Sequence, residues 1–335
     1  MGDCLEKVWR VSQMYDILGV GLALMDVVLT VETFPIKGGC AFIQDSNEFI
    51  GGCTANLLIS ASRLNLKTSL ITKLGMDDVG KRILEKLTEY GIDCKYVKIV
   101  KGSFSGRVYT VMDQEGERTF FSMLPNSAIS KFGEEDIDQD AITNSKVLFG
   151  DGAMFFDKRP ARAVIKAMKI AKDFGVTVAF DPNIRIPGRR LPEEFKTLFE
   201  RSMEISDILL LNEEEVKLLT GKRDLIKAVD YLRETGASLI GIKLGSKGCI
   251  VASGHKIIYC PAFDLKVVDI VGAGDAFNAG FIYGHLKGWD LERIGIFANA
   301  VGGLKVTRKG ASSSPSIEEV FELIKSQPIS GRSLV

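Results

Sequence analysis

The most distinctive segment of the sequence is Asp269-Ile270-Val271-Gly272-Ala273-Gly274-Asp275-Ala276-Phe277, which leads into a predicted helix that runs to about Lys287. Glycines let the backbone turn its N–H groups toward a ligand, and a helix N-terminus adds partial positive charge, so the stretch predicts an anion hole. Asp275 is unusual there, because a carboxylate repels an anion unless it has a chemical task. General base catalysis on a hydroxyl is one such task. Capping of the helix is the alternative.

Upstream of this stretch, short apolar runs alternate with helical ones. Helices are predicted over 56–64, 78–90 and 160–174, and strands over Thr68–Lys73, Val147–Phe149, Val176–Phe180, Ile208–Leu211 and Leu239–Lys243. Such alternation is typical of a parallel sheet with helices on both faces, whose strands are apolar throughout. The sequence therefore predicts an α/β fold with a central, mostly parallel sheet.

Two stretches interrupt this alternation, at about 27–50 and about 96–125. In the second, the alternating segments Arg107–Val111 and Arg118–Phe121 flank the polar residues Asp113–Glu117, which is the pattern of a β-hairpin. These stretches predict a small β-sheet lid that could cover a ligand site. No linker rich in Pro, Gly or Ser divides the chain, so one domain is predicted over 14–325, with the lid segments inserted.

Composition excludes several classes of protein. The 335 residues carry 43 basic and 43 acidic side chains, for a formal net charge of zero, so no overall field favours nucleic acid or a membrane surface. Any anionic ligand must be held by local groups. The six cysteines are scattered without a CxxC pair, and there are two histidines, so neither a zinc knuckle nor a histidine-based triad is predicted.

The residues around two further glycine-containing segments exclude the nucleotide-binding motifs that they partly match. Both Gly80-Lys81 and Gly221-Lys222 are followed by Arg, so the chain has no P-loop, and Gly19–Leu24 is followed by no helix that would bind a dinucleotide. The longest apolar run, Ile17–Val31, is interrupted by Asp26 and is too short to span a bilayer. The N-terminus lacks the apolar core of a signal peptide, and a cytoplasmic protein is expected.

Polar residues follow several predicted strands. Gly51-Gly52 with Asn56 opens a helix, and the three other segments are Asp181–Arg185, Asn212–Glu215 and Lys243–Gly248. Ligands of open α/β sheets bind at the carboxyl ends of the strands, where these segments are expected to converge. A tight strand-to-helix turn is the alternative for the first segment, and a helix cap with an acidic first turn is the alternative for Asn212–Glu215.

Taken together, these segments resemble the ribokinase/PfkB family of carbohydrate kinases, from about Asp16 to the C-terminal helix. The Gly272–Asp275 stretch resembles its most specific signature, Gly51-Gly52 with Asn56 its first signature, Asn212-x-x-Glu215 its NxxE motif and Val306–Ala311 its C-terminal turn. The resemblance implies a ribokinase-like fold and ATP-dependent phosphorylation of a primary hydroxyl of a small sugar.

The resemblance also implies roles for individual residues. Asp275 would be the general base, while Gly272, Ala273 and Gly274 would donate N–H groups to the transferring phosphoryl group. It implies Mg²⁺ ordered by Glu215 through water, a monovalent cation such as K⁺ at Asp269 and the Val271 carbonyl, and a homodimer formed through the lid strands. The implied substrate-binding residues are Asp26, Gly51, Gly52, Asn56 and Arg185, and the implied nucleotide-binding residues are Asn212, Glu215, Lys243, Gly245, Gly248 and Asn299.

The substrate is less closely defined. Leu24 stands where ribokinases have Asn, while Asp181–Arg185 resembles the DPNxR segment of fructokinases and ketodeoxygluconate kinases. Those enzymes commonly carry Tyr-x-Arg in the lid, but Phe120–Leu124 has no arginine, so a neutral sugar is expected. Two alternatives remain open at this point. One is a nucleoside kinase, with Phe42, Phe104 and Phe121 stacking on the base, and the other is a non-catalytic sugar-binding regulator.

Overall fold

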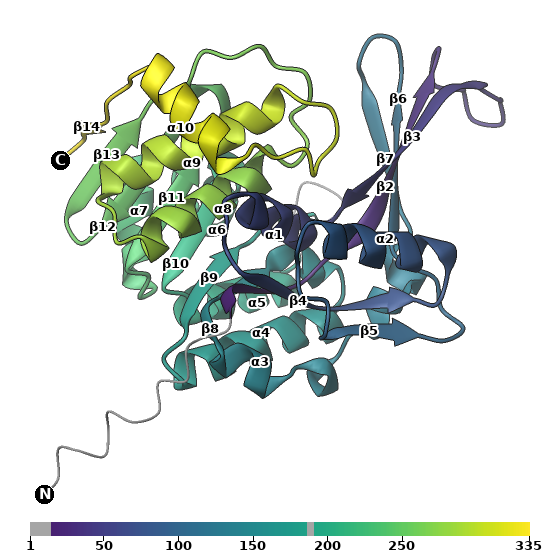
Figure 1. Cartoon of the computed structure of the whole chain (residues 1–335), viewed down its shortest axis with the longest axis horizontal. Helices are drawn as coiled ribbons and strands as arrows, with labels where there is room; N and C mark the ends of the chain where they lie inside the picture. The colour runs from purple at the N-terminus through teal and green to yellow at the C-terminus, as the bar shows by residue number, and fades with distance from the viewer. Residues whose placement is uncertain (1–14, 186–190) are drawn as a thin grey trace, which may run out of the picture.

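The computed structural model describes residues 15–185 and 191–335, and these residues build two β-sheets (Figure 1). Within this part of the chain the large sheet has ten strands, in the order β14-β13-β12-β11-β10-β9-β8-β1-β4-β5. The strands from β11 to β5 run parallel, and β12, β13 and β14 are antiparallel. Their bounds are β1 Tyr15–Val20, β4 Thr68–Gly75, β5 Val97–Val100, β8 Ser145–Asp151, β9 Thr177–Asp181, β10 Ile208–Asn212, β11 Leu239–Lys243, β12 Cys249–Ser253, β13 Lys256–Cys260 and β14 Arg332–Ser333. The predicted mostly parallel sheet is confirmed.

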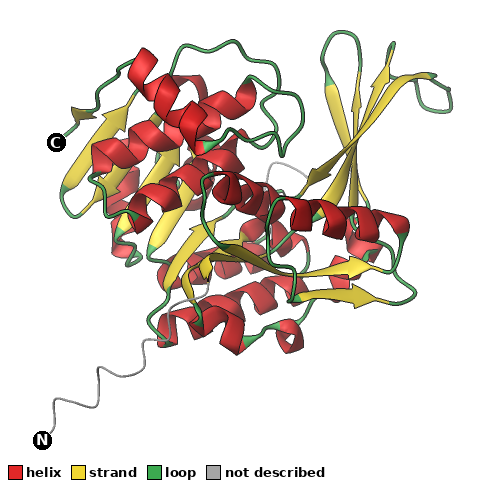
Figure 2. Cartoon of the chain, in the orientation of Figure 1, coloured by secondary structure: helices red, strands yellow, loops and turns green. Residues whose placement is uncertain are grey.

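Helices cover both faces of this sheet (Figure 2). In β10 the side chains of Ile208 and Leu210 pack into one hydrophobic core, and those of Leu209 and Leu211 pack into a second core on the opposite face. Burial of each such side chain contributes about 1.5–3 kcal/mol. The first core is closed by α1 Cys53–Arg63, α2 Asp78–Glu89, α8 Ala273–Leu286, α9 Leu291–Val306 and α10 Ile317–Ser326, and the second by α3 Gln139–Thr143, α4 Lys158–Asp173, α5 Glu193–Ile205, α6 Glu213–Thr220 and α7 Leu225–Glu234.

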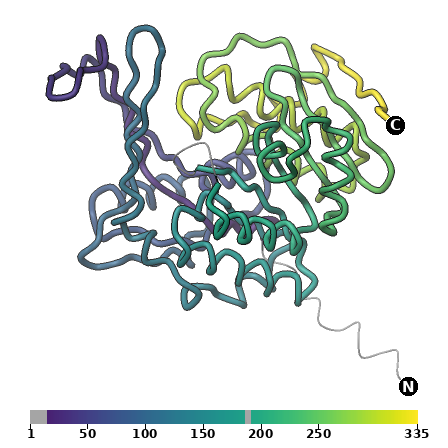
Figure 3. The backbone as a smooth tube through the Cα atoms, turned by 180° about the vertical axis from the view of Figure 1, so that it is seen from behind, coloured from purple at the N-terminus to yellow at the C-terminus, as the bar shows by residue number. Residues whose placement is uncertain are grey.

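The small sheet has the strand order β3-β2-β6-β7 and projects from the body of the molecule (Figure 1, Figure 3). It is formed by β2 Leu24–Val31, β3 Ile43–Gly51, β6 Arg107–Met112 and β7 Arg118–Ser122. The predicted hairpin is confirmed as the antiparallel pair β6–β7. The predicted start of the second lid segment, at about 96, is too early in the chain. The strand β5 pairs with β4 of the large sheet, and the lid resumes only at Arg107, where β6 begins.

Two further boundaries differ from the predictions. The first lid segment, predicted to start at about 27, begins with β2 at Leu24, because the apolar run 17–31 is divided between β1 of the large sheet and β2 of the lid, with Gly21–Ala23 between them. The domain predicted over 14–325 continues beyond its predicted end, since β14 pairs with β13 near the C-terminus; residue 14 lies outside the described residues. No helix in the described part of the chain has the length and apolar character needed to span a bilayer.

Candidate active site

The predicted anion hole lies at the N-terminus of α8. Gly272 caps this helix in a left-handed conformation with φ 82°, and a Cβ atom there would lie 2.2 Å from the carbonyl oxygen of Ala311. A glycine is therefore required at this position. Among the described residues, no acceptor is recorded for the N–H groups of Gly274 and Asp275, whereas Ala273 already donates to the Ile270 carbonyl at 3.2 Å. The open donors are thus Gly274 and Asp275, and the Ala273 N–H is in use.

Asp275 lies in the first turn of α8 and faces the start of α1. Its Oδ2 accepts a hydrogen bond from Asn56 Nδ2 at 2.8 Å, between residues 219 positions apart in the chain. Burial raises the pKa of Asp275 to about 7, with Asp181 and Asp151 raising it further and the Asn56 hydrogen bond and Arg185 opposing this. A carboxyl group with a pKa near neutrality has the basicity that proton abstraction at physiological pH requires.

Asp26, on β2, is a second carboxyl group of this site. Burial raises its pKa to about 7, Arg185 lowers it and Asp269 raises it. Its Oδ2 lies 1.9 Å from where a Cβ atom of residue 51 would be, so only Gly51 leaves room for this carboxyl group. Gly52 caps α1 with φ 94°, a conformation that side chains other than glycine rarely adopt. The structure therefore brings Asp26, Gly51, Gly52 and Asn56 together, beside Asp275.

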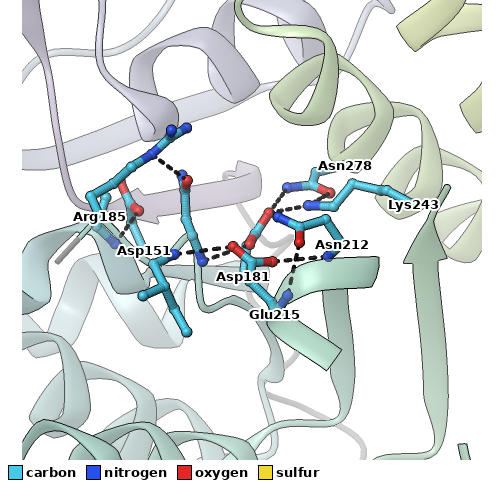
Figure 4. A network of polar contacts seen from close by, with 10 residues as sticks. Asp151, Asp181, Arg185, Asn212, Glu215, Lys243 and Asn278 are labelled. Carbon is cyan, nitrogen blue, oxygen red and sulfur yellow. Dashed lines mark hydrogen bonds and ion pairs between the residues drawn. The ribbon is translucent and has the colours of Figure 1, made fainter. Parts of the chain in front are cut away.

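A network of polar contacts continues from this point along the carboxyl ends of the strands (Figure 4). At its centre Asp181 Oδ2 accepts from Lys243 Nζ at 2.5 Å and from Asn278 Nδ2 at 2.6 Å. Burial lowers the pKa of Lys243, but Asp181 and Glu215 outweigh burial and raise it overall, so the ammonium stays charged. Its Nζ lies 3.9 Å from the position of a Cβ on Gly274, which places a positive charge beside the anion hole.

Arg185 lies at the other end of this network from Lys243 (Figure 4). Its Nε donates to Asn183 Oδ1 at 3.0 Å, and the side chain remains exposed. Its positive charge lowers the pKa of both Asp26 and Asp275.

Asn212 and Glu215 form a capping box at the start of α6. Asn212 Oδ1 accepts from Glu215 N at 2.9 Å, and Glu215 Oε2 accepts from Asn212 N at 2.9 Å. Glu215 Oε1 accepts from Ile184 N at 3.0 Å, which ties the Asp181–Arg185 segment to α6. Burial and Asp181 raise the pKa of Glu215 to about 7, and Lys243 opposes them. The helix-cap alternative is thus confirmed, although each carboxylate oxygen keeps a lone pair for a further partner.

The remaining nucleotide-binding candidates lie on one side of the large sheet. Gly245 and Gly248 shape the turn between β11 and β12, where Leu244 N donates to the Gly248 carbonyl. Asn299 is buried on α9, and its Nδ2 donates to the carbonyls of Cys260 and Pro261 at 3.0 and 2.9 Å. The amide nitrogen of Asn299 therefore holds the end of β13 in place.

The predicted cation ligand Asp269 already has partners. Its Oδ1 accepts from Val271 N and its Oδ2 from Gly310 N, both at 3.0 Å. Its main-chain carbonyl accepts from Lys305 Nζ at 2.9 Å. Burial lowers the pKa of Lys305, while Asp269 and Asp275 oppose that effect.

Several polar residues of the site were not singled out from the sequence. Asp151, at the end of β8, accepts from Thr54 Oγ1 at 2.9 Å and from Ala153 N at 2.9 Å, and burial raises its pKa to about 6. Asn278 and Lys305 lie inside helices and carry no local signal. Asp151 had one, because a carboxylate directly after a buried parallel strand falls at the ligand-binding edge of the sheet.

Known proteins resemble this chain over nearly its whole length. The family model for pfkB family carbohydrate kinases matches residues 14–318. An ATP-dependent ribose-1-phosphate kinase of Halopiger xanaduensis is 32% identical over 308 residues, which are 92% of this chain and 97% of that protein. Among solved structures, the Arabidopsis thaliana ribokinase complexed with ribose and ATP is 27% identical, with a TM-score of 0.81 over 93% of this chain and 99% of that one. An Escherichia coli protein described as a candidate Ribokinase II, in complex with ATP and Mg²⁺, is 25% identical, with a TM-score of 0.83 over 93% of this chain and 100% of that one.

Proposed function

The chain belongs to the pfkB family of carbohydrate kinases and is a phosphotransferase, and on that premise we propose that it transfers the γ-phosphoryl group of ATP to a primary hydroxyl of a small neutral sugar. The observation that carries this proposal is the position of Asp275. A carboxyl group with a pKa of about 7 lies in the first turn of a helix in which the N–H groups of Gly274 and Asp275 have no backbone acceptor among the described residues. No role as a simple helix cap accounts for it, because Asp275 accepts from Asn56 on another helix.

In the proposed reaction, Asp275 takes the proton of the sugar hydroxyl as that oxygen attacks phosphorus. The hydrogen bond from Asn56 Nδ2 fixes the orientation of the carboxylate, so that its other oxygen is free for the substrate. Arg185 keeps part of the carboxyl population ionised by lowering its pKa. A base held in this way contributes about 10²–10⁴-fold to the rate.

Negative charge that develops on the transferring group meets two kinds of donor. The N–H groups of Gly274 and Asp275 offer preorganised hydrogen bonds at the helix N-terminus. Lys243 adds a full positive charge, which Asp181 and Asn278 hold in one orientation. These N–H groups and Lys243 together supply the positive potential for an anion that the neutral net charge of the chain does not provide.

The residues present fit ATP and Mg²⁺. A Cβ on Gly272 would lie 2.2 Å from the Ala311 carbonyl oxygen, so glycine is required where α8 begins, and the N–H groups of Gly274 and Asp275 in the first turn would bind phosphate. Glu215 has carboxylate oxygens and lies next to Asp181 and Lys243, where it could order a hydrated Mg²⁺ through water, since Mg²⁺ usually keeps several waters. Bound Mg²⁺ would neutralise charge on the phosphates. Gly245, Gly248 and Asn299 would lie toward the base of the nucleotide.

The sugar would bind between the lid and α1. Asp26 and Asn56 offer acceptors and donors for hydroxyl groups, and the Asn56 Oδ1 atom is buried without a partner among the described residues. A sugar hydroxyl would satisfy that oxygen, since an unpaired buried acceptor is costly. Within the described ranges 15–185 and 191–335, the charge of Arg185 acts on both Asp26 and Asp275, and Phe120–Leu124 of the lid has no arginine that would give a substrate carboxylate a second guanidinium partner.

The nucleoside kinase alternative depends on which aromatic residues of the lid share the face of Asp26. Strand register places Asp26, Val108 and Ser122 on one face of the lid and Val27, Tyr109 and Phe121 on the other. Phe121 therefore points away from the Asp26 face and is not placed to stack on a base bound there. Phe120, two residues from Ser122, shares the face of Asp26 and is the aromatic residue that a base would meet.

A homodimer through the lid remains part of the proposal. Large apolar side chains are exposed on the lid at Phe42 (87%) and Phe120 (62%), and Ile43 and Phe121 are exposed beside them. Such a concentration of apolar side chains on a small projecting sheet is typical of an interaction surface.

The test is a screen of pentoses, hexoses and nucleosides with ATP and Mg²⁺, read by coupled ADP release. We expect turnover with at least one neutral sugar. Turnover with nucleosides alone would contradict the sugar substrate. The same screen on Asp275→Asn distinguishes transfer from contaminating ATPase activity, because only the former should fall with the base.

A further inference from the structure

Lys305 is an unusual lysine, because its side chain is completely buried (0% exposed) in the last turn of α9. Lysine is almost never fully buried unless its charge is paired. Its ammonium group contacts only oxygen atoms among the described residues. Nζ lies 2.9 Å from the Asp269 carbonyl, 3.5 Å from the Arg308 carbonyl and 3.9 Å from Asp269 Oδ2.

These oxygen atoms belong to the two segments that shape the anion hole. The Val306 carbonyl accepts from Val268 N at 2.7 Å and from Asp269 N at 3.0 Å, which joins the end of α9 to the segment before α8. Gly310 N donates to Asp269 Oδ2, and the Ala311 carbonyl packs against Gly272. The Lys305 ammonium lies inside this junction, and it contacts the carbonyl of Asp269, a few positions before the N–H groups of Gly274 and Asp275 in the sequence.

We propose that the Lys305 ammonium is a built-in substitute for a dissociable monovalent cation, so that the enzyme works without potassium. Backbone carbonyls and a carboxylate are the oxygen ligands that replace the hydration shell of K⁺. An ammonium group has three donors and no acceptor, and it satisfies the same oxygens by hydrogen bonds. Asp269 and the Val271 carbonyl therefore do not fit a free potassium ion here, because a second cation beside a buried ammonium would be repelled.

Lys305 is a positioning residue in this proposal. It touches neither the sugar nor the phosphates, and it acts by holding the 268–274 and 306–311 segments together. The proposal rests on the proposed kinase function for its activity readout, but the binding of potassium can be measured without it. A tethered ammonium needs no ion from solution, so K⁺ should neither stabilise nor activate the wild-type protein.

The first experiment compares the wild-type protein in potassium chloride and in tetramethylammonium chloride at equal ionic strength. Thermal unfolding and ADP release are measured in both. We expect equal Tm values and rates that agree within about twofold. A rise in Tm together with a several-fold higher rate in potassium would overturn the proposal. If no sugar is turned over, the proposed function fails, and the unfolding data still decide whether potassium binds.

The second experiment uses Lys305→Ala, which removes the ammonium and leaves its space open. The rate without potassium should fall about 10²-fold, the range seen when an element of an anion hole is lost. Potassium or ammonium ions should restore much of the rate and raise Tm in this variant alone. Lys305→Met, which fills the same space without charge, should lose activity and gain nothing from potassium.

The exposed neighbour Lys309→Ala is the matched control and should behave as the wild type in both salts. A folded Lys305→Ala protein that keeps the wild-type rate without potassium would overturn the proposal. So would one that potassium neither stabilises nor reactivates. If Lys305→Ala does not fold, the comparison of the wild-type protein in the two salts and the kinetics of Lys305→Met still test whether the ammonium group replaces a potassium ion.

Discussion

Replacing Asp275 by Asn should damage catalysis and stabilise the fold. Asn has the same shape and can still accept from Asn56 Nδ2, but it cannot take a proton. We expect kcat to fall by about 10²–10⁴-fold, the contribution of a positioned general base. Sugar affinity should change little, because the Asp26 and Asn56 contacts remain.

The stability gain follows from the raised pKa of Asp275. A carboxyl group with a pKa of about 7 in the folded protein and 3.8 otherwise binds its proton more tightly when folded. The ionised form therefore lowers the free energy of unfolding, with an upper bound of about 4 kcal/mol at about 1.4 kcal/mol per pKa unit. Partial exposure of the side chain reduces this to about 1–2 kcal/mol. The penalty is absent below pH 4, grows between about 4 and 7 and is complete above pH 7, so the variant should gain most at pH 8.

The assay is urea unfolding of both proteins at pH 8 and pH 5, with ADP release measured across the same range. Wild-type kcat/KM should rise with pH up to about 7. The pKa read from this profile belongs to Asp275, Asp26 and Glu215 together, because the three carboxyl groups titrate in the same range. Asp290→Asn at the N-cap of α9 is the matched control and should change neither quantity, since both residues cap helices well. A variant with wild-type turnover, or one destabilised at pH 8, would refute the reasoning.

Four further outcomes are expected. Lys243→Met should lower kcat/KM by about 10²-fold and destabilise the fold by about 3 kcal/mol, because Asp181 loses its buried partner. The control variant Lys247→Met changes an exposed lysine of the same turn and should have neither effect. Equal kinetics for the two variants would exclude a role of Lys243 in binding phosphate. Gly272→Ala should cost at least about 2 kcal/mol in urea unfolding, from its positive φ and the 2.2 Å contact, and a neutral result would show that the helix start can rearrange. EDTA should reduce ADP release to background and Mg²⁺ should restore it; full activity in EDTA would contradict the magnesium requirement. The double variant Phe42→Ser, Phe120→Ser should sediment as a monomer where the wild type sediments as a dimer. A wild-type protein that sediments as a monomer would contradict the proposed lid interface.

The fold could be predicted from local patterns. The four apolar residues of β10 are buried on both faces, as a continuous apolar run between helices requires, and the polar turn at Asp113–Glu117 joins β6 to β7. The start of the lid's second segment could not be predicted in the same way. Val97–Val100 is a short apolar run that suits either sheet, and only its pairing with β4 assigns it to the large one.

Part of the candidate site was also within reach of the sequence. Gly272, Gly274 and Asp275 predict an anion hole with a base, because a helix start that binds an anion needs backbone N–H groups left uncovered within a few consecutive residues. The capping box of Asn212 and Glu215 is likewise local, since its residues are three positions apart. In such cases the chemistry and the geometry lie in one short segment.

Local sequence patterns indicate which chemical groups are available: bare backbone at a helix start, an aspartate beside it and polar residues at strand ends. The partners of these groups depend on how distant segments pack against one another. This packing sets Asn56 against Asp275, Lys243 against Asp181, and Lys305 against the Asp269 carbonyl, across 36 to 219 positions of the chain. The physical reason is that pKa values and hydrogen bonds depend on burial and on neighbours a few ångströms away, and packing of the helices on the sheet chooses those neighbours. A lysine in the last turn of a helix is commonplace in the sequence, and only the packing of distant segments places the Lys305 ammonium against the Asp269 and Arg308 carbonyl oxygens.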